Sequence, residues 1–157
     1  MDILSLKKIL SLLLEAEAKT KARIEKYIDI QNNSILVNFS DDEETRKAEY
    51  SKLKSFSVKL ASDIEAADVY AAKLSSFICE ADKEMKNNIT IILIRIFDGY
   101  CAWRASAEKF IAKSENIFEN NDKNKYALLF SETRTLHSAT DTLCSLINNE
   151  ILNIIEQ

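Results

Sequence analysis

The sequence predicts an all-α protein, an elongated antiparallel four-helix bundle that forms one domain over residues 1–157. Proline is absent and Gly99 is the only glycine, whereas sheets and tight turns normally need both residue types at their corners. Four long segments also place apolar residues at alternating steps of four and three, which is the spacing of a helix packed among other helices.

The first helix is expected from about Asp2 to Gln31. Leu6, Leu10 and Leu13 lie on its apolar face, and Asp2 is placed to meet the positive end of the helix dipole. Farther along, acidic and basic residues alternate, which is typical of a solvated helix face. These residues are Glu15, Glu17, Lys19, Lys21, Arg23, Glu25, Lys26 and Asp29.

Residues 32–39 (NNSILVNF) interrupt the pattern, and we expect an ordered loop there. Ser40 then begins a capping box, in which its hydroxyl accepts from the amide of Glu43 and the Glu43 carboxylate reaches back. A second helix is expected to continue to about Lys86.

Two consecutive steps of four, through Phe56, Leu60 and Ile64, predict a local stutter in the second helix. Without a break this helix would be about 69 Å long at about 1.5 Å per residue. We therefore expect either a rod-shaped bundle or a helix kinked near Ser55–Ser57.

Ile89–Phe118 is the densest apolar segment, and it is interpreted as the central helix of the bundle. Asn87 and Asn88 are expected to form the turn before it, and residues 120–122 (NND) the break after it. The fourth helix is predicted from about Lys123 to Ile155. Its expected seam is Leu129, Thr133, Leu136, Thr140, Leu143, Ile147, Ile151 and Ile154, and the two threonines indicate polar contacts inside the bundle.

Composition excludes several classes of function. The net charge of −4 and the pI of about 5.2 argue against a general nucleic-acid binder, which would carry a basic field. No run approaches 18 apolar residues, so no transmembrane segment is expected. Cys79, Cys101 and Cys144 are dispersed without a CxxC spacing, which indicates reduced thiols in a cytoplasmic protein.

No catalytic, metal or cofactor site is predicted. The three cysteines lie on different helices and His137 is the only histidine, so the four residues lack the spacing of zinc ligands. His137 and Asp141 are four residues apart and are interpreted as a surface ion pair. With one glycine, the glycine-rich loops that bind phosphates are impossible. We therefore expect that the protein is not an enzyme and binds no cofactor.

One patch of the central segment is unusual, and any function hidden in the core is expected there. Arg95 and Asp98 are three residues apart and are expected to pair on one face. Gly99 in a helix interior costs about 1 kcal/mol against alanine, which indicates either close packing of another helix or a kink or ligand gap. Trp103 and Arg104 complete the patch.

The leading functional hypothesis is a non-enzymatic helical module that binds another protein. The acidic residues Asp41, Asp42, Glu43 and Glu44 are its predicted contact surface. An immunity-, inhibitor- or chaperone-like role matches these limits by analogy of fold alone. Two alternatives are a self-assembling structural protein, such as a homodimer, and a membrane-surface or apolar-ligand binder that uses Ile89–Phe97.

Overall fold

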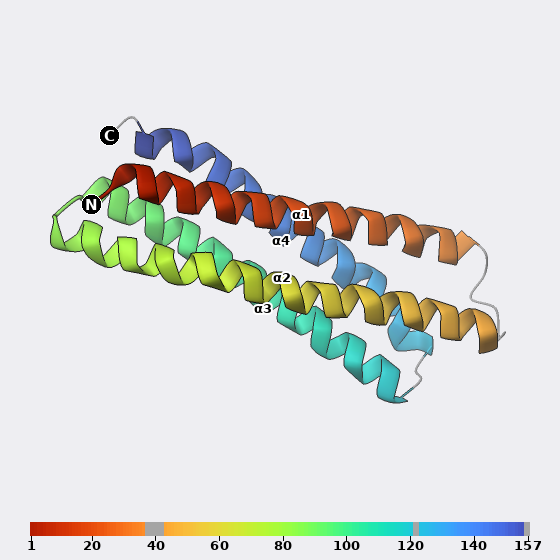
Figure 1. Ribbon diagram of the computed structural model, residues 1–157. Coiled ribbons are helices and arrows are strands. Elements are labelled where there is room, and N and C mark those ends of the chain that lie inside the picture. Colours follow the sequence, from red (N-terminus) through yellow and green to blue (C-terminus); the bar gives the residue numbers. More distant parts are fainter. Residues whose placement is uncertain (37–42, 121–122, 156–157) are drawn as a thin grey trace.

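The computed structural model describes residues 1–36, 43–120 and 123–155, and these ranges form four long helices without a strand. In chain order they are α1 (Ile3–Leu36), α2 (Glu43–Lys83), α3 (Asn87–Asn120) and α4 (Lys123–Ile155). α1 packs against α2 and α4, and α3 packs against the same two helices (Figure 1). The fold is therefore the predicted antiparallel four-helix bundle.

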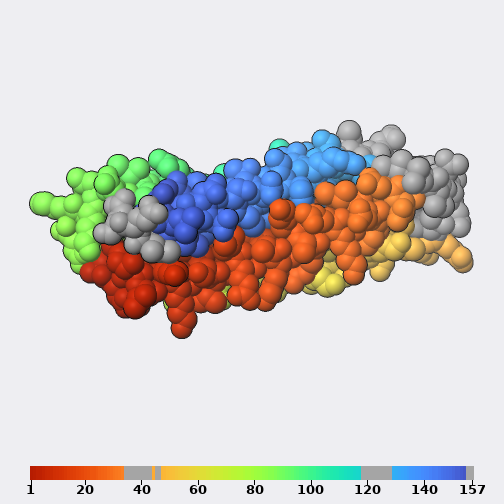
Figure 2. Space-filling view, turned by 90° about the horizontal axis from the view of Figure 1, so that it is seen from above, coloured from red at the N-terminus to blue at the C-terminus, as the bar shows by residue number. Residues whose placement is uncertain are grey.

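The bundle is a rod rather than a sphere. α2 has 41 residues, which corresponds to about 62 Å at about 1.5 Å per residue. Figure 2 shows α1 and α4 side by side along the length of the molecule. α3 is one of four equivalent corners, so the expectation of a single central helix is wrong.

Each helix directs residues into the core at alternating steps of four and three, and this series of buried positions is called the seam. On α1 and α2 the buried seam residues are Leu6, Leu10, Leu13, Glu17, Thr20, Ile24, Tyr27 and Gln31, then Leu53, Ser57, Leu60, Ile64, Ala67, Ala71, Leu74 and Ala81. On α3 and α4 they are Ile89, Leu93, Ile96, Tyr100, Trp103, Ala107, Phe110, Ser114 and Ile117, then Leu129, Thr133, Leu136, Thr140, Leu143, Ile147, Glu150 and Ile154.

The seam of α2 has no stutter because Ser57, rather than Phe56, occupies the seam position. Phe56 is buried as well, but its ring stacks on Tyr27 of α1 beside the seam. α2 is an unbroken helix through residues 55–57, and Figure 1 shows no sharp bend there. The expected kink is therefore wrong, and the rod shape accommodates the full length of the helix.

The first helix is longer than predicted at its C-terminal end. It continues past Gln31 to Leu36, so the loop expected from Asn32 onward is wrong for residues 32–36. Contacts with α4 hold these polar residues in the helix: Gln31 Nε2 donates to Thr133 Oγ1 at 2.9 Å, and Arg134 Nη2 donates to Asn32 Oδ1 at 3.0 Å. The rest of the loop and the Ser40 cap lie outside the described residues.

The start of α1 follows the prediction for Asp2. Asp2 Oδ1 accepts from the backbone N–H groups of Leu4 at 3.0 Å and Ser5 at 3.3 Å, which satisfies amides that have no partner within the helix. Hydrogen bonds from Ser5 lower the pKa of Asp2, and the bond from the Ser5 side chain has a larger effect than the bond from its backbone N–H.

The turn between α2 and α3 lies three residues earlier than predicted, at residues 84–86, and Asn87 already belongs to α3. Met85 adopts a left-handed conformation with φ of 57°. The N–H of Lys86 donates to Ala81 O at 2.9 Å, and the N–H of Met85 donates to Asp82 O at 3.1 Å. This pair of bonds is a Schellman motif, which normally places glycine at the left-handed position.

The connection between α3 and α4 agrees in part with the prediction from the sequence. α4 has the predicted bounds, Lys123 and Ile155, but Asn120 is the last residue of α3 rather than part of a break. Asn121 and Asp122 lie outside the described residues.

We predict that Met85→Gly stabilises the protein by roughly 0.5–1 kcal/mol, because a non-glycine residue in this conformation costs about 1–2 kcal/mol. Met85 is 83% exposed, so its side chain contributes little packing. Urea denaturation followed by circular dichroism measures the change. Met85→Ala keeps the Cβ and serves as the control, and an equal gain in both variants would contradict this explanation.

Candidate functional site

The residues of the predicted core patch all lie on α3, but they contact two different helices, α4 and α2, and do not form one site. Arg95 lies toward α4, where its Nη1 donates to Glu150 Oε1 at 2.9 Å. Asp98 is exposed and makes no ion pair within the described residues, so the expected Arg95–Asp98 pair is wrong. Glu150 occupies a seam position and is only 8% exposed, and a carboxylate so deeply buried needs a charged partner.

Gly99 and Trp103 both serve close packing of α3 against α4. A Cβ atom on Gly99 would lie 3.1 Å from Leu146 Cδ2 and 3.5 Å from Leu143 Cδ1, so the glycine permits this approach. Trp103 is fully buried, and its Nε1–H donates to Thr140 Oγ1 at 3.0 Å. Helix packing, one of the two explanations offered by the sequence, therefore accounts for the glycine.

Arg104 belongs to an ionic network that joins α3 to α2. Its Nε and Nη2 donate to the two oxygens of Asp68 at 2.9 and 3.0 Å, and its Nη1 bonds Glu108. Tyr100 donates its hydroxyl to the same Asp68 carboxylate. The hydrogen bonds from Arg104 lower the pKa of Asp68. The pKa of Tyr100 is raised, mainly by burial and to a smaller extent by its hydrogen bond to Asp68. Arg104 is held by both carboxylates, and its bonds to Asp68 join α3 to α2, so the network is a structural link.

Glu17 is the buried ionisable group that sequence reasoning missed. It was expected on a solvated face, but it occupies a seam position and is 0% exposed. Neither carboxyl oxygen has a hydrogen-bond partner within the described residues. Burial raises its pKa from 4.5 to about 8, and the negative charge of Asp63 adds to the rise. Glu17 is therefore mainly neutral at pH 7, and the uninterrupted spacing Leu13–Glu17–Thr20 was the signal for its burial.

The other ionisable candidates of the sequence are paired differently from the prediction. His137 Nε2 lies 3.1 Å from Glu25 Oε1, and Asp141 Oδ1 lies 2.7 Å from Lys21 Nζ. Both partners are on α1, so the expected His137–Asp141 pair is wrong, because cross-helix carboxylate and amine groups compete for these side chains. Among the described residues, no three metal-binding side chains come together.

Half of the predicted acidic contact surface lies outside the described residues. Asp41 and Asp42 precede the described part of α2, and Glu43 is its first residue. Glu44 is exposed. This surface stays a prediction.

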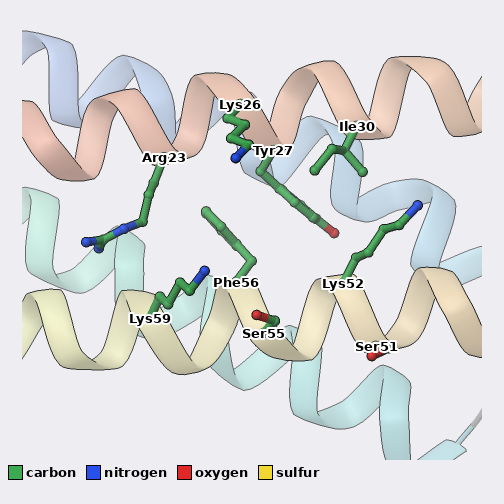
Figure 3. Close-up of a pocket in the computed structure, with 9 residues that line it drawn as sticks. All are labelled: Arg23, Lys26, Tyr27, Ile30, Ser51, Lys52, Ser55, Phe56 and Lys59. Carbon is green, nitrogen blue, oxygen red and sulfur yellow. The ribbon is translucent and has the colours of Figure 1, made fainter.

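An open groove of about 500 Å³ lies between α1 and α2 (Figure 3). Four cationic side chains surround it, Arg23 and Lys26 from α1 and Lys52 and Lys59 from α2. Figure 3 shows Arg23, Lys52 and Lys59 extending into the space between the two helices and Lys26 lying against α1. Sequence reasoning had assigned the two α1 residues to a solvated face without recognising that α2 supplies cations opposite them.

Aromatic rings form the floor of the groove. Tyr27 and Phe56 stack with their centroids 4.4 Å apart and their planes at 8°. Behind them, Phe110 of α3 meets Phe56 edge-on at 5.4 Å. Tyr27 is only 3% exposed and Phe56 only 7%, so the floor is rigid and offers ring edges rather than open ring faces.

Two of the four cations are paired with carboxylates. Arg23 Nη1 bonds Asp63 Oδ1 across the two helices, and Lys52 Nζ lies 3.2 Å from Glu49 Oε1. Asp63 is largely buried, with 16% of its side chain exposed. These pairs hold Arg23 and Lys52 at the groove.

The other two cations, Lys26 and Lys59, have no carboxylate partner within the described part of the chain. They line the groove from opposite helices (Figure 3). Ser51 and Ser55 add hydroxyl groups to the lining on the α2 side. The groove therefore has an apolar floor and an excess of positive charge, in a protein with a net charge of −4.

The Ile89–Phe97 segment has both buried and exposed isoleucines. Ile89 and Ile96 are in the core, whereas Ile91 and Ile94 are 55% and 43% exposed. None of the helices, as far as they are described, combines the length and the apolar character that crossing a membrane requires.

Comparisons with known protein families, curated proteins and solved structures found no match to this chain. Functional inference therefore depends on the geometry of its own residues.

We predict that the free energy of unfolding falls as pH rises from about 5 to 8, by up to about 1.4 kcal/mol per pH unit. In this window the folded protein keeps a proton on Glu17, with its pKa of about 8, which the unfolded chain, with a pKa near 4.5, has lost. Urea denaturation at several pH values measures the slope.

Glu17→Gln should remove this dependence on pH, because glutamine does not ionise. The matched control is Glu15→Gln, since Glu15 is exposed on the same helix. Parallel pH profiles for the wild type and Glu17→Gln would show that the buried carboxyl is not the source.

Proposed function

We propose that the chain is a non-enzymatic helical protein that acts by binding another protein through the groove face of α1 and α2. The observation that carries this proposal is the open groove with aromatic residues at its floor and cations around it. Protein interfaces have this anatomy, an apolar centre enriched in aromatic residues and arginine inside a polar rim. An immunity-, inhibitor- or chaperone-like role is the finer form of the proposal, by analogy of fold.

The lining of the groove supports binding rather than catalysis. Ser51 and Ser55 supply hydroxyls, but the described residues of the lining include no histidine or carboxylate to activate them. The three cysteines are free thiols, which supports the proposed cytoplasmic location.

Contact with a membrane surface or an apolar ligand is a second candidate, favoured by the exposure of Ile91 and Ile94. Liposome flotation distinguishes it, because the groove proposal expects no flotation. Self-assembly into a homodimer is a third, and light scattering over a concentration series separates it from a monomer that binds a different protein.

We predict that Ser55→Trp weakens partner binding at least about tenfold, because the indole fills the groove and blocks the contacts of the partner at its centre. The partner is identified by cross-linking in the native host, purified, and titrated by calorimetry. Ser55 is exposed, so the substitution leaves the core intact.

Ser76→Trp is the matched control, since Ser76 is also exposed on α2, three heptads farther along and outside the groove lining. Reversal of Asp41–Glu44 to lysine tests the acidic surface in the same titration. If Ser55→Trp binds the purified partner as tightly as the wild type does, the groove is not the contact.

A further inference from the structure

We propose that the α1–α2 groove accommodates an acidic segment of a partner protein, whose carboxylates bridge Lys26 and Lys59 across the two helices. This inference rests on the proposed function and names the chemistry of the partner at that site.

The charges at the groove favour an anionic occupant. Four cations line it, and the carboxylates of Asp63 and Glu49 pair with two of them, which leaves two positive charges. Lys26 and Lys59 line the groove from opposite helices (Figure 3), so we expect one bound segment to contact both. Its carboxylates would relieve the repulsion between the two ammonium groups and form charge-assisted hydrogen bonds with them.

The dimensions of the groove suit a short piece of polypeptide. On α1 its lining extends from Arg23 to Ile30, which corresponds to about 10 Å at about 1.5 Å per residue. That length matches about two turns of a helix, or about three residues of an extended strand at about 3.3 Å each. Ile30 and the edges of the aromatic rings provide apolar contact between the charged groups.

A nucleic acid fits the same site less well. Bases bind proteins by stacking on open aromatic faces, but Tyr27 and Phe56 stack on each other at 4.4 Å and are almost fully buried. The carboxylates of Asp63 and Glu49 also stand beside the cations and would repel a continuous phosphate backbone. Separate carboxylates on a peptide can avoid these positions.

The test uses a fluorescein-labelled synthetic peptide of twelve residues with four glutamates placed around one leucine and one phenylalanine. A matched peptide carries glutamine at the four glutamate positions. Fluorescence anisotropy should show that the wild-type protein binds the glutamate peptide at least about tenfold more tightly. The difference should shrink as salt is raised, because surface charge pairs are screened.

The double variant Lys26→Glu with Lys59→Glu should lose at least about tenfold in affinity for the glutamate peptide. The charge-matched control is Lys73→Glu with Lys109→Glu, which reverses two exposed lysines outside the groove. Circular dichroism confirms that both variants remain helical. A single-stranded DNA of ten nucleotides is titrated in parallel.

Three results would overturn the inference: equal affinity for the two peptides, equal loss in the control variant, or tighter binding of DNA that is lost in the groove variant. The failure of the proposed function is separate. If Ser55→Trp blocks an identified partner but no acidic peptide binds, the groove is the contact and only the chemistry of its occupant is wrong. If acidic peptides bind but no protein partner is found, the site remains and the proposed function fails.

Discussion

The bundle depends on the requirement that every helix send a side chain into one shared core at each step of its seam. The steps of four and three recur along all four helices, with half-buried Ile78 filling the step between Leu74 and Ala81 of α2, and this regularity allows α2 to run for 41 residues without a kink. Position in the seam decides which side chains are buried more strongly than their apolar or polar character does. Glu17, Gln31, Ser57 and Glu150 are buried because of where they fall in the series, despite their polarity.

The polar residues of the seam differ in how their hydrogen-bonding groups are satisfied. Thr133, Thr140 and Ser114 donate to carbonyl oxygens four residues earlier in their own helices, and Thr140 also accepts from Trp103. Such hydroxyls are satisfied locally and cost little. Glu17 has no such partner, so its burial lowers stability even when the carboxyl is neutral, and lowers it further when the carboxyl ionises.

The fold class and the bounds of α4 could be predicted because periodicity and the lack of proline are local properties of the chain. Glu17 and Ser57 were misplaced because the character of the residue was given more weight than its position in the series. The groove could not be predicted, since it requires the pairing of Tyr27 with Phe56 and of Arg23 with Asp63, on two helices whose register the sequence does not state. Glu150, which pairs with Arg95, and Asp68, which pairs with Arg104, likewise lie on other helices.

The burial of Glu17 couples folding to the uptake of a proton from the solvent. Between the pKa of the unfolded carboxyl and the value of about 8 in the bundle, the chain takes up about one proton from the buffer each time it folds. The heat measured by calorimetry at neutral pH therefore includes the ionisation enthalpy of the buffer. Phosphate and Tris, whose ionisation enthalpies differ, would give different apparent enthalpies for the same structural transition.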